Sequence, residues 1–211
     1  MANFGFDDLR LVNPYEVAFR EAVSAVGGAH VLQTARVFNT VADAVAECSL
    51  VVGTTAGQHR ELQQPIERIE SGMQAVRAHA GRVALLFGSE KFGLSNEELS
   101  YCHSLIRIST EPKTPSMNLG QAVAVCLYEL TRGEQPKPRR RRMDAAEGAD
   151  AEQLTKMLLG VLEKSGYTNR ITAVSTEQKI RRFVRRMRLT QRDVPLVLGI
   201  LRQVLWKIEG K

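Results

Sequence analysis

Short apolar runs alternate along the first part of the chain with segments in which apolar residues recur at helical spacing. The apolar runs predict buried strands at residues 9–12, 50–52, 83–87 and 105–108. Helical patterns predict helices at residues 15–26, 41–48, 66–76 and 117–130, with a further helix start at Ser95. Strands that alternate with helices favour a parallel sheet covered on both faces, so an α/β domain is expected.

The rest of the chain is helical by pattern and follows a segment of different composition. Residues 133–150, GEQPKPRRRRMDAAEGAD, combine prolines, an arginine run and small acidic residues without apolar periodicity, which is typical of a linker. Three apolar stripes then predict a small three-helix unit over residues 151–211. The expected organisation is therefore an α/β domain at residues 1–132, a linker at 133–150 and a helical unit at 151–211.

The composition of the chain indicates an anionic binding partner. The 211 residues carry a net charge of +6 with a pI of about 9.5, which favours nucleic acid as a partner. Cys48, Cys102 and Cys126 are isolated and the four histidines are scattered, so we expect reduced cysteines and no metal site. No apolar run approaches the roughly 20 residues that span a membrane. With no signal-peptide pattern at the N-terminus, a soluble cytoplasmic protein is expected.

Three predicted strand ends run into small or polar residues that suit a ligand. They are Gly53-Thr54-Thr55, the stretch from Gly88-Ser89-Glu90 to Gly93, and the stretch from Ser109 to Ser116-Met117-Asn118. Ligands of open parallel sheets bind beyond the carboxyl ends of the strands, and glycines there let the backbone approach closely. The spacing is neither GxGxxG nor GxxxxGK[ST], which disfavours a Rossmann dinucleotide or P-loop site. A plain strand-to-helix turn remains the alternative for each end.

Several of these stretches resemble a known family. GSEKFGLSNEEL, at residues 88–99, and PSMNLGQAVAVCLYEL, at 115–130, are similar to the second and third motifs of the SPOUT RNA ribose methyltransferases. NFGFDDLRLVNP and SLVVGTTA, at residues 3–14 and 49–56, resemble two further strands of that family. The helical tail resembles the C-terminal extension of the TrmJ-type tRNA 2′-O-methyltransferases.

The resemblance implies a parallel-sheet SPOUT domain with a trefoil knot near its C-terminal edge, followed by a small helical unit. It also implies S-adenosylmethionine bound by the knot loops, and a homodimer across which the active sites are completed. The cofactor-binding positions that match the family are Thr54, Gly88, Ile108, Met117 and Leu119.

The resemblance assigns catalytic roles to three polar residues. Glu90 matches the glutamate of the second motif, and Ser116 and Asn118 match the serine and asparagine of the third. They are expected to position the ribose 2′-hydroxyl and a catalytic arginine near the methyl group, because alignment is most of the task in an in-line displacement.

The first motif of the family, with an asparagine and the catalytic arginine in a pattern like NxGxxxRAM, has no counterpart here. It would lie just before NFGF, and Met1 falls on the methionine two residues after that arginine. We therefore expect an N-terminally truncated chain or a start assigned to an internal methionine, and a chain without that arginine is expected to be inactive. Gly57 also stands where the family often has an arginine, and Arg60 nearby is not assigned that role.

Basic residues of the second predicted tail helix are candidates for RNA contact. Arg181, Arg182, Arg185 and Arg186 are expected to lie opposite the apolar stripe of that helix. A merely solvated basic face is the alternative, and the same two interpretations apply to the arginine run at residues 139–142.

Together these observations predict methyl transfer from S-adenosylmethionine to a ribose 2′-hydroxyl of RNA, with tRNA as the expected substrate. The alternatives are a ribosomal-RNA ribose 2′-O-methyltransferase and a catalytically impaired RNA-binding relict of the family.

Overall fold

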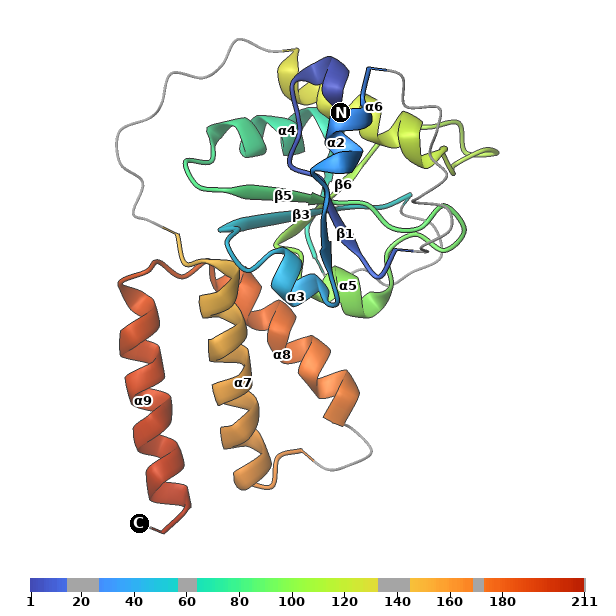
Figure 1. Ribbon diagram of the computed structural model, residues 1–211. Coiled ribbons are helices and arrows are strands. Elements are labelled where there is room, and N and C mark those ends of the chain that lie inside the picture. Colours follow the sequence, from blue (N-terminus) through green and yellow to red (C-terminus); the bar gives the residue numbers. More distant parts are fainter. Residues whose placement is uncertain (15–26, 57–63, 133–144, 169–172, 211) are drawn as a thin grey trace.

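The computed structural model describes residues 1–14, 27–56, 64–132, 145–168 and 173–210. An α/β part is followed by three long helices that extend away from it (Figure 1). The helix predicted at residues 15–26 lies outside the described residues.

The α/β part contains a four-stranded parallel sheet in the order β4-β6-β3-β5. Its strands are β3 (Leu50–Thr54), β4 (Ile66–Arg68), β5 (Val83–Leu86) and β6 (Ser104–Arg107). In the register of the sheet, Val52 of β3 lies opposite Leu85 on one side and Ser104 on the other. Strands β1 (Arg10–Val12) and β2 (Arg36–Phe38) form a separate parallel pair. The predicted parallel-sheet α/β class is confirmed.

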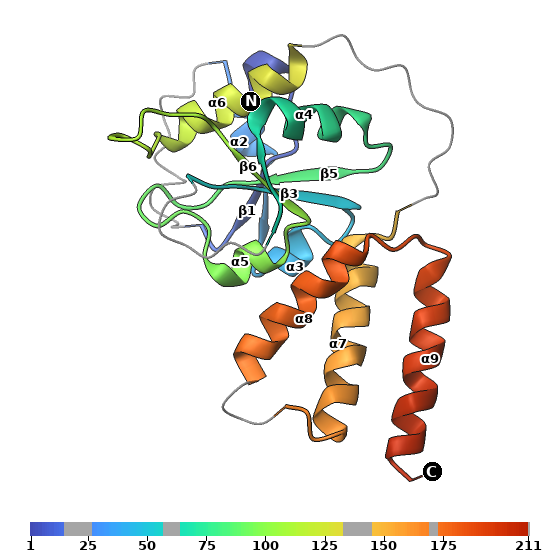
Figure 2. The same cartoon turned by 180° about the vertical axis from the view of Figure 1, so that it is seen from behind.

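Helices cover both faces of this sheet (Figures 1 and 2). Helices α4 (Ile69–Ala78) and α6 (Leu119–Thr131) lie on one face, and α3 (Val41–Ala44) and α5 (Asn96–Ser100) lie on the other. Side chains alternate along β3, so that Val51 packs towards α5 while Leu50 and Val52 pack towards α4. A short 3-10 helix η1 (Ala2–Phe4) and helix α2 (Ala29–Gln33) complete this part.

Three details differ from the sequence prediction. Ile66 belongs to the edge strand β4 and not to the helix predicted over residues 66–76, which begins only at Ile69. Strand β2 was not predicted because its residues are mostly exposed, so it has no apolar run. Strand β6 begins and ends one residue earlier than predicted, which leaves Ile108 just beyond the strand.

The three predicted tail helices are present as α7 (Gly148–Lys164), α8 (Ala173–Met187) and α9 (Asp193–Ile208). Helix α7 lies between the other two (Figure 1). Their shared core consists of Ala151, Leu154, Val184, Val194 and Leu198. Within the described chain, no helix is both long enough and apolar enough to cross a membrane.

The helical unit docks against α3 and α5 of the α/β part. Helix α7 begins inside the segment predicted as a linker, and the amide of Ala149 donates a hydrogen bond of 2.9 Å to the carbonyl of Ala46. A side chain at Gly148 would collide with the carbonyl of Val45. The glycine therefore allows the start of α7 to touch the end of α3.

Candidate active site

A cavity of about 290 Å³ lies at the carboxyl ends of β3, β5 and β6. It is enclosed by segments that follow these three strands, at residues 54–56, 87–94 and 108–117, and by the start of α6. The sequence analysis identified the same three strand ends. Their meeting follows from the topology, because the carboxyl ends of parallel strands share one edge of the sheet.

The segment after β5 is a tight loop closed by two glycines. The amide of Gly93 donates to the carbonyl of Ser89 at 2.8 Å, and Gly93 has a φ of +66°, which favours glycine. A Cβ on Gly88 would collide with the backbone of Gly93, so the two ends of the loop are in direct contact. The loop leads into α5, where the side chains of Ser95 and Glu98 form a capping box.

The loops after β5 and β6 are joined by a hydrogen bond between two predicted catalytic residues. The Asn118 Nδ2 group donates to Glu90 Oε1 at 3.1 Å, while Asn118 Oδ1 accepts from the amide of Gln121 and caps α6. Both side chains are exposed to solvent. Both the nitrogen and the oxygen of the Asn118 side-chain amide are therefore hydrogen-bonded, which fixes the position of Glu90 relative to α6.

The other predicted site residues lie around the same cavity. Its lining includes Ser116 and all five positions expected to contact the cofactor: Thr54, Gly88, Ile108, Met117 and Leu119. The hydroxyl of Thr54 donates to the carbonyl of Leu86 at 3.0 Å. This bond directs the threonine hydroxyl towards β5.

Sequence reasoning missed part of the lining and misjudged one glycine. Leu94, at the end of the loop after β5, and Leu99, on α5, both line the cavity. The sequence analysis did not identify them because both also belong to the hydrophobic core and no motif includes them as ligand contacts. Gly53 was expected to leave room for a ligand. A side chain there would instead collide with Cys102 and Leu105, so this glycine serves packing.

The lining of the cavity is mixed apolar and polar, with few charged groups. Glu90 and Lys91 are the charged residues of its lining among the described residues. Phe92, at the tip of the loop, is 70% exposed, and the Lys91 ammonium lies 5.1 Å from the centre of its ring. A cavity with both apolar and polar lining and the Glu90 carboxylate suits a ligand that combines a flat ring with polar groups.

Two of the four predicted RNA-binding arginines are buried, so their expected exposure is wrong. Arg181 is 4% exposed and Arg185 is 2% exposed, because the side of α8 that carries them packs against the α/β part. Arg181 forms ion pairs with Glu152 and Glu177, and Arg185 donates to the carbonyl of Gly148. Burial lowers the pKa of Arg185, whereas the partners of Arg181 outweigh its burial and raise its pKa.

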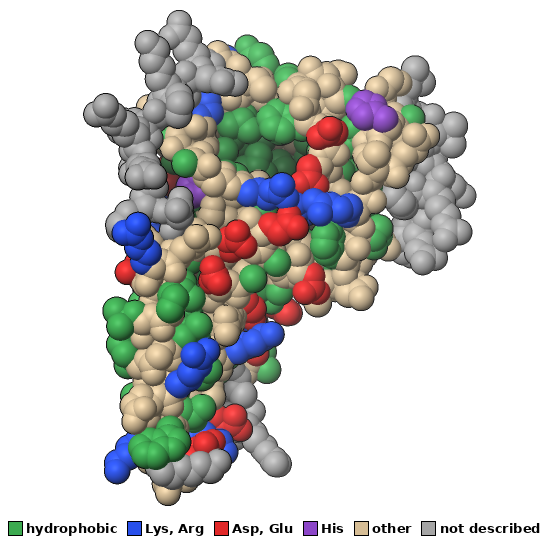
Figure 3. Space-filling view, turned by 60° about the vertical axis from the view of Figure 1, so that its left-hand side comes forward, with side chains coloured by type: hydrophobic (Ala, Val, Ile, Leu, Met, Phe, Trp, Pro, Cys, Tyr) green, Lys and Arg blue, Asp and Glu red, His purple; other side chains and the backbone are tan. Residues whose placement is uncertain are grey.

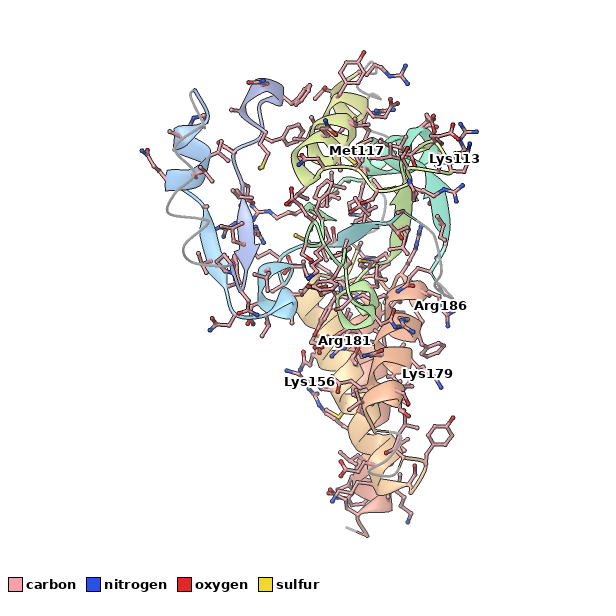
Figure 4. All side chains as sticks on the ribbon, turned by 90° about the vertical axis from the view of Figure 1, so that its right-hand side faces the viewer. Lys113, Met117, Lys156, Lys179, Arg181 and Arg186 are labelled. Atoms are coloured by element: carbon pink, nitrogen blue, oxygen red, sulfur yellow. The ribbon has the colours of Figure 1, made fainter. Side chains whose placement is uncertain are left out.

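The other two predicted arginines, Arg182 and Arg186, differ in exposure. Arg186 is exposed, and Arg182 is half-buried and donates to the carbonyl of Asn96 at 3.3 Å. Figure 4 shows Arg186 and Lys179 on α8 below Met117 and Lys113, and Arg181 at the junction of the two parts. Gly57, Arg60 and the arginine run at residues 139–142 lie outside the described residues.

Charge elsewhere is mixed. On the face in Figure 3, Lys and Arg side chains are interspersed with Asp and Glu, and hydrophobic side chains lie both in a hollow of the α/β part and along the helical part. Arg10, Arg36 and Arg82 are paired with Asp8 and Glu47. In the portion of the chain that the structure describes, no group of His, Cys, Asp and Glu is arranged to hold a metal ion.

Comparison with known proteins agrees with this geometry. The chain is similar to two tRNA (cytidine/uridine-2′-O-)-methyltransferases named TrmJ. The one from Salmonella choleraesuis is 31% identical over 100% of this chain and 90% of its own length. The one from Yersinia pestis is 33% identical over 97% and 83%. The crystal structure of TrmJ from Z. mobilis superposes with a TM-score of 0.85 and 31% identity, covering 97% of this chain and 89% of that one.

These similarities extend through the helical tail, and they confirm the predicted resemblance to RNA methyltransferases of this type. A family model, that of the SpoU rRNA methylases, matches residues 1–128, which is more than half of the 211 residues. The chain therefore belongs to the SpoU rRNA methylase family.

Proposed function

We propose that this protein transfers a methyl group from S-adenosylmethionine to a ribose 2′-hydroxyl of tRNA. The observation that carries the proposal is the cavity at the three strand ends, with Glu90 and Asn118 hydrogen-bonded at its edge, in a chain of a methylase family. The choice of tRNA is supported by relatives that carry this activity in their name and match the chain together with its tail.

The residues present fit the cofactor. Ile108, Met117 and Leu119 offer apolar surface for an adenine ring, and the tight loop from Gly88 to Gly93 lines the same cavity. The Glu90 carboxylate provides negative charge for a cationic centre. S-adenosylmethionine supplies an electrophilic methyl group on a positively charged sulfur.

The polar residues orient the substrate in this proposal. Glu90 and Ser116 line the cavity, and Asn118 fixes Glu90 through its amide. Their task is to hold the ribose hydroxyl in line with the methyl group, since misplacement by about 1 Å can reduce a rate on the order of 100-fold. The expected arginine of the first motif has no counterpart in this sequence, so its role is assigned to no residue of this chain.

Three further features belong to the proposal. The RNA-binding face is reduced to the outer side of α8, which carries the exposed residues Lys179 and Arg186 seven positions apart. A homodimer is expected from the family resemblance, and Tyr128 of α6, which is 55% exposed, provides apolar surface that a second chain could cover. An enzyme acting on tRNA is expected to work in the cytoplasm.

Methyl transfer to RNA tests the proposal directly. A chain extended upstream by an NxGxxxRAM segment, which restores the missing arginine, is incubated with an unmodified tRNA transcript and S-adenosylmethionine carrying a labelled methyl group. Digested RNA is then examined by mass spectrometry. We expect 2′-O-methylated nucleosides in tRNA. Asn118→Ala should reduce transfer on the order of 100-fold because Glu90 loses its support, while the affinity for S-adenosylhomocysteine changes little. Asn39→Ala, at an exposed asparagine outside the cavity lining, is the matched control.

Each other result points to a different conclusion. Label in ribosomal RNA but not in tRNA would favour the ribosomal alternative. Binding of S-adenosylhomocysteine without transfer to either RNA would favour the RNA-binding relict. A folded chain that does not bind S-adenosylhomocysteine in calorimetry would overturn the proposal altogether.

A further inference from the structure

Arg181 contacts both the helical tail and the α/β part. Its Nε and Nη2 atoms bond both carboxylate oxygens of Glu152 on α7, at 3.1 and 3.2 Å, and Nη2 also bonds Glu177 at 2.6 Å. Its Nη1 atom crosses to the other part and donates to Ser100 Oγ at 3.2 Å. The guanidinium also lies 4.4 Å from the centre of the Tyr101 ring, a cation–π contact.

These contacts hold α5 at both ends. Ser100 is the last residue of α5 and Asn96 is the first, and the carbonyl of Asn96 accepts a hydrogen bond from Arg182 at 3.3 Å. Consecutive arginines of α8 therefore bind opposite ends of this five-residue helix. A helix this short has little stability of its own, so its position depends on what packs against it.

Helix α5 is at the same time a wall of the proposed cofactor cavity. Leu99 lines the cavity from α5, and Leu94 lines it from the residue before the helix cap. The loop closed by Gly88 and Gly93 leads directly into that cap. A shift of α5 would therefore move Leu94 and Leu99 and change the shape of the cavity.

The grip of Arg181 is specific to an arginine. The bidentate bond to Glu152, the crossing bond to Ser100 and the stack on Tyr101 use the planar, multi-donor shape of the guanidinium. A lysine could pair with one carboxylate but could not make all of these contacts together.

We propose that Arg181 is a positioning residue that couples the helical tail to the cofactor cavity through α5. Binding of RNA to the outer side of α8 then changes the affinity for the cofactor, and the cofactor changes the affinity for RNA by the same factor. The inference rests on the proposed function, since it takes the cavity as the cofactor site and α8 as the RNA face.

The test measures S-adenosylhomocysteine affinity by calorimetry on the full chain. We expect Arg181→Met to weaken binding on the order of tenfold, and Arg181→Lys to restore only part of it. Arg202→Gln removes an exposed arginine of α9, elsewhere in the tail, and should leave the affinity within about twofold. In the original chain, saturating tRNA should tighten S-adenosylhomocysteine binding several-fold, and this effect should disappear in Arg181→Met.

Hydrogen exchange provides a second readout that is independent of cofactor and RNA. Amides of α5 should exchange faster in Arg181→Met and in the milder Ser100→Ala, which removes only the crossing hydrogen bond and the local bond to Glu97. If Arg181→Met does not fold, Ser100→Ala and Arg181→Lys carry the test. Unchanged α5 exchange and unchanged affinity in the folded variants would overturn the inference. Failure of the original chain to bind S-adenosylhomocysteine would instead refute the proposed function.

Discussion

His103 shows at the scale of one residue how the docked tail affects the α/β part. Its Nδ1 atom accepts a hydrogen bond of 3.0 Å from the amide of Val51, and the side chain is buried. Burial lowers the pKa of His103 to about 3, and the positive charges of Arg185 and Arg188 act in the same direction. The imidazole is therefore neutral at ordinary pH and serves as a hydrogen-bond acceptor.

This lowered pKa predicts a loss of stability in acid. The unfolded chain takes up a proton on this histidine below about pH 6.5, but the folded chain does so only near pH 3. The free energy of unfolding should thus fall between pH 7 and pH 5, by about 2 kcal/mol from this group. His103→Asn keeps an acceptor for Val51 and should lose less stability over the same range in urea unfolding. Equal losses in both chains would contradict the prediction.

Single residues also show what could be read from the sequence and what could not. Glu90 and Asn118 were predicted from motifs and do lie together at the cavity, because parallel strands bring their ends to one edge. The burial of Arg181 and Arg185 could not be predicted. Helical periodicity separates an apolar from a basic face, but whether a basic face meets solvent or another element depends on contacts more than 80 residues apart in the chain, such as Arg181 to Ser100.

At the scale of elements, α8 has two sides with different tasks. One side carries buried arginines that bind the rest of the protein, and the other carries the exposed residues Lys179 and Arg186. The sequence prediction treated the arginines of this helix as one group. Strands β3 and β5, by contrast, were predicted well. Helices cover both faces of the sheet, so these strands are continuous apolar runs in the sequence.

The outer side of α8 predicts a measurable salt effect. Replacing both Lys179 and Arg186 by glutamine should weaken tRNA binding and reduce the slope of its salt dependence by about one unit per lost phosphate contact. Filter binding over a range of salt concentrations measures this slope. Lys156→Gln, at an exposed lysine of α7, is a single-charge control. A slope that stays the same in the double variant would mean that this side is only solvated.

At the scale of the whole molecule, the two parts are held at separate points. The start of α7 touches the end of α3 through the Ala149 to Ala46 hydrogen bond, and α8 grips α5 through Arg181 and Arg182. Contacts on two different helices fix an orientation better than one contact would. The tail thus has a defined direction relative to the α/β part, as Figure 1 shows.

Gly148 offers a way to loosen one of these points without touching the site. Gly148→Ala places a methyl group against the carbonyl of Val45, and overpacking of this kind typically costs about 1–3 kcal/mol. We expect the tail to undock more often, with faster exchange of the Ala149 amide and a larger radius of gyration in X-ray scattering. Gly199→Ala in α9, where a side chain would meet open space, should leave both unchanged. A compact Gly148→Ala chain with a protected amide would show that the junction tolerates the methyl group.

The strand order β4-β6-β3-β5 has a consequence for folding during synthesis on the ribosome. No two neighbouring strands of this sheet are consecutive in the chain. Strand β3 therefore cannot pair until β5 has been synthesised, and β4 cannot pair until β6 has been synthesised. At about 5–20 residues per second, the stretch between β3 and β6 takes several seconds to synthesise. During that time β3 exposes apolar side chains and unpaired edges, which makes the nascent chain a natural client for chaperones. The cavity is completed only after the start of α6 has emerged, so a growing chain gains its ligand site late.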